Sequence, residues 1–207
     1  SGLGFDINLP GIYECIVGDA EAKDVILHSE DIKKLWLLPS SINLVAADTE
    51  LSTMDNAHHI MKSIVDSVRD NYDYIFIDCP PSLGMLTVKA LSVSDGIVIP
   101  MQCEFYSLEG MSQLLNTVKK IRQLYNPSLQ IVGMLLTMYN GRLTLTNQVV
   151  AELKKYYSEL LFKVPISRTV RLSEAPSHGK PITAYDRTSR GAEAYTALAA
   201  EFLKKQV

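Results

Sequence analysis

The chain has 207 residues, of which 47% are hydrophobic and 21% are charged, and its formal net charge is -3. This composition predicts a globular protein with a sizeable core, and the acidic balance excludes a general polyanion-binding protein. No apolar run approaches the ~18 residues of a membrane helix, and three widely spaced cysteines argue against a disulfide framework or a zinc site and favour the cytosol.

Charge is distributed unevenly along the chain. Residues 1–55 carry three basic residues against ten acids, whereas residues 163–190 carry six basic residues against Glu174 and Asp186. The second segment is a local basic patch on an acidic molecule. A solvated surface and a polyanion-binding surface both remain compatible with this pattern.

Alternating strand and helix patterns follow one another along the chain. Periodicity and turn signals predict helices at 12–17, 21–27, 55–68, 86–91, 107–125, 146–160 and 189–205, and strands at 35–38, 42–46, 74–78, 96–100, 131–137 and 163–166. Residues 167–187 are expected to form a basic loop. Strands that alternate with helices predict an α/β fold, with a doubly wound, mainly parallel sheet covered by helices on both faces.

The predicted strand at 74–78 is the most informative stretch. It is apolar on both faces, as in a central parallel strand, and it ends at Asp78 because the prolines that follow cannot donate ladder hydrogen bonds. Ligands of such sheets bind beyond the carboxyl ends of the strands. Asp78 is therefore either a carboxylate that holds hydrated Mg²⁺ beside a phosphate or a residue that caps the next turn.

Four blocks of sequence carry a family resemblance. They are YDYIFIDCPPSLGMLTVKAL at 72–91, PMQCEFYSLEGMSQLLNTV at 100–118, GMLLTMYNGR at 133–142 and VRLSEAPSHGKPITAYDRTSRGAEAY at 170–195. In this order they resemble the ParA/Soj chromosome- and plasmid-partitioning ATPases, which have a P-loop NTPase-like fold. The resemblance implies that residues 1–207 form one ParA-like ATPase domain in a truncated form.

The P-loop of that family has no counterpart in the sequence. No segment fits G-x-x-x-x-G-K-[ST], and the pair Gly179–Lys180 is followed by Pro181. We therefore expect that the chain lacks the N-terminal strand–P-loop–helix unit. A full-length parent would be a Mg-ATPase, whereas this chain, without P-loop lysines and backbone donors, is expected neither to bind nor to hydrolyse ATP.

The resemblance implies a nucleotide site. Asp78 matches the Walker B aspartate, which would hold Mg²⁺ through water, and Pro80 and Gly84 match the switch loop after it. The positions that flank adenine are Asn140, Ile166, Ser167 and Arg168. The alternatives are a tight loop without ligand contacts at 80–84 and a turn asparagine beside Gly141. The family usually reads Ile-Pro-Arg where this chain has Ile166-Ser167-Arg168, so Ser167 stands where the family has proline.

Two further surfaces follow from the resemblance. The homodimer interface would include Gln102, Glu104 and Tyr106, although an ordinary loop after the strand is equally compatible. Non-specific DNA would contact Arg142, Arg171, Lys180, Arg187 and Arg190. A ParB/Spo0J-type partner protein would stimulate hydrolysis, and the protein would be cytoplasmic and nucleoid-associated, with no membrane contact. The alternatives are a non-enzymatic DNA- or partner-binding fragment and a MinD-like membrane-cycling ATPase.

Overall fold

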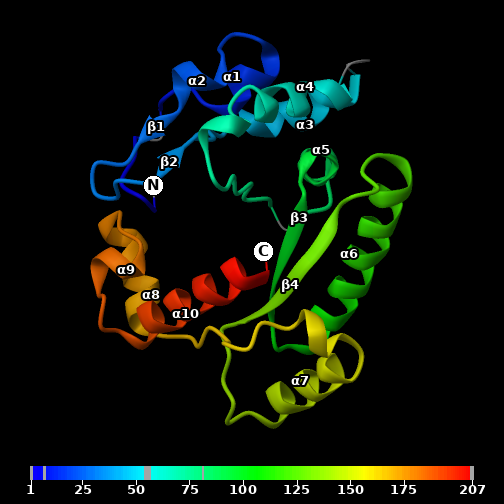
Figure 1. Ribbon diagram of the computed structural model, residues 1–207, viewed down its shortest axis with the longest axis vertical. Coiled ribbons are helices and arrows are strands. Elements are labelled where there is room, and N and C mark those ends of the chain that lie inside the picture. Colours follow the sequence, from blue (N-terminus) through cyan, green and yellow to red (C-terminus); the bar gives the residue numbers. More distant parts are fainter. Residues whose placement is uncertain (1, 7, 54–56, 81, 206–207) are drawn as a thin grey trace. The chain divides into compact units, whose positions relative to one another are not determined.

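The computed structural model describes residues 2–6, 8–53, 57–80 and 82–205 (Figure 1). These residues form two compact units. The C-terminal unit comprises Ser1–Phe5 and Asp95–Val207, and the N-terminal unit comprises Asp6–Ser94. No helix in the described part of the chain is long and apolar enough to cross a membrane.

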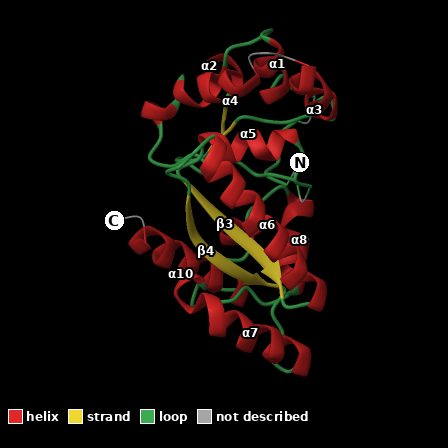
Figure 2. Cartoon of the chain, turned by 90° about the vertical axis from the view of Figure 1, so that its right-hand side faces the viewer, coloured by secondary structure: helices red, strands yellow, loops and turns green. Residues whose placement is uncertain are grey.

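A parallel pair of strands forms the centre of the C-terminal unit. Strand β3 (Gly96–Gln102) pairs in parallel with β4 (Gln130–Thr137) (Figure 2). The last residues of the two strands, Gln102 and Thr137, lie opposite each other. Helix α6 (Phe105–Leu124) connects them, as a crossover between parallel strands requires. The predicted strands at 96–100 and 131–137 and the helix between them are confirmed.

Helices cover both faces of this pair. On one face of the sheet, side chains of β3 and β4 pack against α6 and α7 (Thr144–Tyr157). Met134 belongs to this cluster and is fully buried. Leu135 points to the opposite face and packs in one cluster with Leu198 and Phe202 of α10 (Arg190–Lys205). Figure 1 shows α10 beside β4. The predicted α/β class, with a parallel sheet between helices, is confirmed.

The strand predicted at 163–166 is not assigned, although this segment does run beside β4. Phe162 N donates to Met134 O at 3.0 Å and Ile166 N donates to Leu136 O at 2.8 Å. Between these bonds, Lys163 N donates to the Glu201 carboxylate instead, and Pro165 has no N–H. Only isolated bridges therefore remain, and the prediction of a regular strand is wrong.

The expected loop at 167–187 contains short helices. They are α8 (Val170–Glu174), the 3-10 turn η3 (Ala175–His178) and α9 (Ile182–Tyr185), and another 3-10 turn, η2 (Ser158–Leu160), follows α7. Local caps explain this correction: Thr169 Oγ1 accepts from Leu172 N at 3.3 Å, and Gly179 ends η3 with a left-handed φ of 64°.

The N-terminal unit is mainly helical. Its elements are α1 (Ile12–Val17), α2 (Ala22–Val25), β1 (Leu27–His28), β2 (Trp36–Leu37), α3 (Leu44–Thr53), α4 (Ala57–Asp66), η1 (Arg69–Asn71) and α5 (Met85–Val93). A core of Ile16, Ala47, Leu51 and Met61 joins α1, α3 and α4. The helices predicted at 12–17 and 86–91 are confirmed. The helix predicted from 55 is confirmed over α4, but Asp55 lies outside the described residues.

Two predicted strands of the N-terminal unit are wrong. Residues 42–46 lead into helix α3. Leu44 N donates to Ser41 O and Asn43 N donates to Ser41 Oγ, which begins a turn. Alanines after Val45 favour a helix, so the chain continues from this turn as α3. Residues 74–78 are irregular and exposed, and the described strands pair only as β1 with β2 and β3 with β4. A β-favouring run without a ladder is not a stable strand.

Candidate functional site

The candidate site of the C-terminal unit lies beyond the carboxyl ends of β3 and β4. Because these strands are parallel and their last residues pair, the segments after Gln102 and after Thr137 leave the sheet at the same edge. Predicted site residues follow both strands. The sheet therefore places the predicted dimer residues and the predicted base-binding residues at one edge.

The structure brings the two predicted adenine-flanking segments together. Tyr139 N donates to Ile166 O at 3.0 Å, and Tyr139 and Ser167 form a parallel bridge. Ile166 is buried, whereas Asn140, Ser167 and Arg168 are exposed. The buried isoleucine thus anchors a segment whose next two side chains reach solvent beside Asn140.

Asn140 also organises its own turn. Its Oδ1 accepts from Arg142 N at 3.2 Å, and its backbone carbonyl accepts from Leu143 N at 3.1 Å. Asn147 Nδ2 donates to Gly141 O at 3.2 Å and ties this turn to α7. The turn interpretation of Asn140 is therefore present in the structure, and its contact with a base stays a prediction.

Met138 lies at this edge and is not among the residues predicted from the sequence. Its φ is +49°, which is the left-handed region that side chains other than glycine, asparagine and aspartate rarely adopt. Its side chain is 55% exposed, directly before Tyr139 and Asn140. Strained backbone of this kind is often retained where a binding site needs it.

The end of β3 presents aromatic side chains. Glu104 occupies the N-cap position of α6, and Phe105 and Tyr106 after it are 67% and 78% exposed, with their rings edge to face at 5.6 Å. Tyr106 is a predicted dimer residue, whereas Phe105 was not selected. Exposed aromatic pairs of this kind are typical of protein interfaces.

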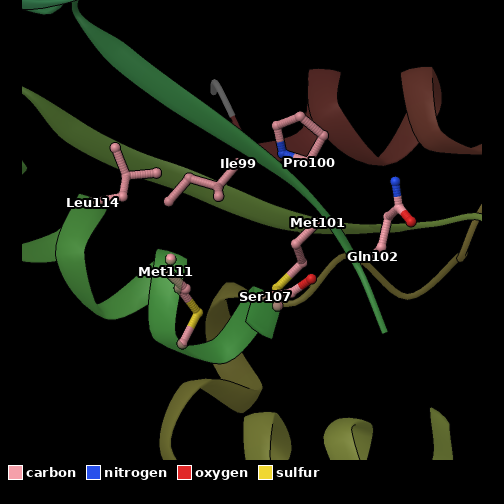
Figure 3. A pocket seen from close by; sticks show the side chains of 8 residues that line it. Ile99, Pro100, Met101, Gln102, Ser107, Met111 and Leu114 are labelled. Atoms are coloured by element: carbon pink, nitrogen blue, oxygen red, sulfur yellow. The ribbon is translucent and has the colours of Figure 1, made fainter. Parts of the chain in front are cut away.

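A shallow pocket of about 230 Å³ lies between β3 and α6. Met101 and Met111 line it, and Figure 3 shows Met101 directed toward Ser107 while Gln102 projects to the other side of the strand. This alternation follows from the pleat of the strand. Because Gln102 follows directly after Met101, its side chain points away from α6.

The predicted magnesium site belongs to the N-terminal unit. Asp78 is exposed on the irregular segment 74–80, and Pro80 after it is exposed as well. Cys79 is an exposed residue, but partial burial of its sulfur and, secondly, the Asp78 carboxylate raise the pKa of the Cys79 thiol. Gly84 is the N-cap residue of α5, in extended conformation, and Thr87 Oγ1 donates to Ser82 O at 2.8 Å.

The five predicted DNA-binding side chains are all exposed in the C-terminal unit. They are Arg142, Arg171, Lys180, Arg187 and Arg190. Arg171 differs from the others, because its Nη1 lies 3.1 Å from Glu174 Oε2 and its Nε lies 3.4 Å from Asp186 Oδ2. The Glu174 hydrogen bond is the main cause that raises the pKa of the Arg171 guanidinium above its ordinary value, so this group stays charged.

Comparison with known proteins decides the family. Residues 2–131 match the model of a family described as an AAA domain. The sporulation initiation inhibitor protein Soj of Bacillus subtilis is 50% identical over 190 residues, which cover 92% of this chain and 75% of Soj. The chain belongs to the ParA/Soj family of partitioning ATPases.

Another member supports this assignment, and a solved structure supports the fold. The chromosome partitioning protein ParA of Myxococcus xanthus is 43% identical over 207 residues, which cover 99% of this chain and 73% of that protein. The crystal structure of cobyrinic acid a,c-diamide synthase from Mycobacterium smegmatis with a bound ATP analogue and magnesium matches with a TM-score of 0.80 and 30% identity. This match covers 98% of this chain and 75% of the synthase. The P-loop NTPase-like fold of the ParA/Soj family is thereby confirmed.

Proposed function

We propose that the chain is the greater part of a chromosome- or plasmid-partitioning ATPase that forms a Mg-ATP-dependent homodimer on DNA. The observation that carries this proposal is the 50% identity with Soj over 92% of the chain. Within this function, a ParB-type partner stimulates hydrolysis, and the protein works in the cytoplasm on the nucleoid. The edge beyond β3 and β4 is the natural place for the dimer contacts, since Tyr106 and Phe105 are exposed there.

The residues present fit two parts of a Mg-ATP site. Asn140 and Ser167 lie on adjacent, hydrogen-bonded segments, where an amide and a hydroxyl can bind the edge of a base. Asp78 is an accessible carboxylate of the type that holds hydrated Mg²⁺. Bound Mg²⁺ would neutralise phosphate charge and orient the terminal phosphate, which is the chemistry that the metal supplies in this class of ATPase.

The third part of the site, the phosphate cradle, is not encoded in these 207 residues. No segment fits the P-loop pattern, so neither its lysine nor its row of backbone N–H donors is available to the phosphates. Asp78 repels phosphate unless Mg²⁺ lies between them. We therefore propose that this polypeptide by itself does not bind or hydrolyse ATP, although the full-length protein does both.

Titration with a fluorescent ATP analogue, with and without Mg²⁺, tests this proposal. We expect no saturable binding to the 207-residue chain and Mg²⁺-dependent binding once a segment with a P-loop is supplied at its N-terminus. In that longer protein, Asp78→Asn should weaken binding in Mg²⁺ and have a smaller effect in EDTA. Saturable Mg²⁺-dependent binding to the 207-residue chain would contradict the proposal and require a second phosphate cradle.

A second candidate function is a fragment that binds DNA or a partner without catalysis. The observation that favours it is the exposure of the five cations of the C-terminal unit in a chain without a P-loop sequence. DNA binding that is ATP-independent, falls with salt and is weakened in Arg142→Ala would support it. DNA binding that appears only in the longer protein with ATP would favour the ATPase alone.

Membrane cycling of the MinD type is less well supported. It would use an amphipathic C-terminal helix whose apolar face is available to lipid. Here the apolar face of α10, including Leu198 and Phe202, packs against the sheet. Liposome flotation with anionic vesicles is expected to leave the protein in the unbound fraction.

A further inference from the structure

The two acidic residues of the basic segment 163–190 both contact the same arginine. Glu174 and Asp186, which we call the carboxylate pair, flank Arg171 at 3.1 Å and 3.4 Å. Among the residues that the structure describes, no other cation of this segment, Lys163, Arg168, Lys180, Arg187 or Arg190, lies within ion-pair distance of a carboxylate. The negative charge of the segment is thus concentrated on one cation.

Each member of the carboxylate pair also accepts a hydrogen bond from a hydroxyl group. Tyr185 Oη donates to Glu174 Oε2 at 3.3 Å, and Thr188 Oγ1 donates to Asp186 Oδ1 at 3.3 Å. Tyr185 stacks on His178, with ring centroids 4.9 Å apart. These contacts fix the carboxylates in place, so a phosphate that approaches Arg171 meets two positioned negative charges.

The cluster of Arg171 and the carboxylate pair is nevertheless accessible to a polyanion. The side chains of Arg171, Glu174 and Asp186 are 57%, 40% and 28% exposed. Ion pairs with this exposure are weak, so a phosphate can replace them. The charge of Arg171 is offset by two carboxylates, and this cluster therefore adds repulsion to the encounter with DNA, whereas the other four proposed contacts add attraction.

We propose that Glu174 and Asp186 lower the affinity of this surface for DNA by holding Arg171 in their ion pairs, and so set the strength of non-specific binding. This inference rests on the proposed DNA-binding function of the segment. In a partitioning protein, such a setting keeps binding weak and reversible. Removal of either charge frees Arg171 for one more phosphate contact.

The test uses isosteric substitutions that keep the hydrogen-bond acceptors. Glu174→Gln retains an acceptor for Tyr185 Oη, and Asp186→Asn retains one for Thr188. Each should tighten binding to a fluorescein-labelled duplex of arbitrary sequence by about two- to fivefold, which is the range expected for one exposed ion pair. The slope of log K against log salt should become steeper by about 1, as for one additional phosphate contact.

Three further variants give the test its specificity. Glu152→Gln changes the net charge equally but lies on α7, in an ion pair with Lys155, and should change affinity less than twofold. Arg171→Ala should weaken binding only slightly in the wild-type background and should abolish the gain in the Glu174→Gln background. Melting temperatures of all variants check the fold, and Glu174→Gln carries the test alone if Asp186→Asn unfolds.

The outcomes separate this inference from the proposed function. If the wild type binds DNA and Arg142→Ala weakens binding, but Glu174→Gln leaves binding unchanged or weaker, the inference is wrong and the DNA-binding function stands. If the gain persists without Arg171, the carboxylates act only as general charge and the inference is wrong. If no variant binds at the lowest salt, both the inference and DNA binding by this chain are overturned.

Discussion

At the scale of single residues, Gly133 shows how closely the C-terminal unit is packed. A Cβ atom built at this position would lie 2.6 Å from Phe162 Cε2 and 3.0 Å from Leu160 O. The ring belongs to a buried residue and the second atom is backbone, so neither can move freely. The absence of a side chain at position 133 is what allows the 160–162 segment to lie against β4.

Gly133→Ala should therefore destabilise the protein. We expect the free energy of unfolding to fall by ~1–3 kcal/mol, the usual cost of an overpacked core. Gly110→Ala is the matched control: its Cβ would meet no atom within 4 Å on helix α6, and better helix propensity should raise stability by ~0.5–1 kcal/mol. Urea unfolding of both variants measures the difference, and equal stabilities would contradict the packing argument.

Arg171 and Asn140 show what residue patterns can and cannot predict. The sequence identified both as surface candidates, and both are exposed. It could not show that the only two acids of the basic segment meet at Arg171, because that contact depends on how α8 lies against the segment after α9. It gave no signal for the positive φ of Met138, which the backbone path after β4 imposes.

At the scale of elements, helix α10 is held to the sheet by polar contacts as well as by its apolar face. Lys163 N donates to both oxygens of Glu201, at 3.1 and 3.0 Å. Lys205 Nζ donates to Val132 O and Glu159 O, each at 3.4 Å, and lies 4.7 Å above the Phe162 ring. These contacts hold the last turns of α10, which follow the turn where Leu198 packs against the sheet.

Glu201→Ala should loosen the end of α10 without unfolding the unit. The Lys163 amide would lose its acceptor, and the loss of one charge-assisted hydrogen bond at a partly exposed site should cost ~1 kcal/mol. Hydrogen–deuterium exchange should increase in residues 198–205 and at Lys163, while β3 and β4 remain protected. Lys204→Ala, an exposed neighbour in the same turn, should produce a smaller change, and similar exchange in both variants would rule out this role for Glu201.

Elements were predictable where the pattern was long and local. The periodicities of α6, α7 and α10 and the apolar runs of β3 and β4 were read correctly within a few residues. Short elements failed where distant partners decide: residues 74–78 have strand propensity without a ladder, and Pro165 with the Glu201 cap breaks the strand expected at 163–166. The caps of α8 and η3 are local, because Thr169 and Gly179 are residue types that favour such caps.

At the scale of the whole molecule, the exposed apolar segment 74–77 makes this chain prone to associate with other chains. Phe76 is 73% exposed, and Tyr74, Ile75 and Ile77 are between 36% and 46% exposed. Extended apolar segments at the surface favour association with other chains. We expect the 207-residue chain to self-associate through this segment as its concentration rises.

Phe76→Glu should reduce that self-association, because it introduces a charge into the exposed apolar segment. Sedimentation velocity over a concentration series should show a smaller share of oligomers than for the wild type. Tyr156→Glu is the control, since Tyr156 is 64% exposed on α7 of the C-terminal unit, outside the 74–77 segment, and should leave the oligomer distribution unchanged. An equal effect of both substitutions would show that general charge, and not the 74–77 segment, governs association.

Sequence alone determined the family, the α/β class and the principal helices and strands of the C-terminal unit. Long periodic patterns and four ordered blocks specify these features locally, so they do not depend on knowing which segments meet. Tertiary structure decided which polar groups become neighbours: it placed Ser167 beside Tyr139, joined both acids of the basic segment to Arg171, and left 74–77 outside any ladder. Contacts between segments far apart in sequence depend on packing and on hydrogen-bond partners, which no local pattern encodes.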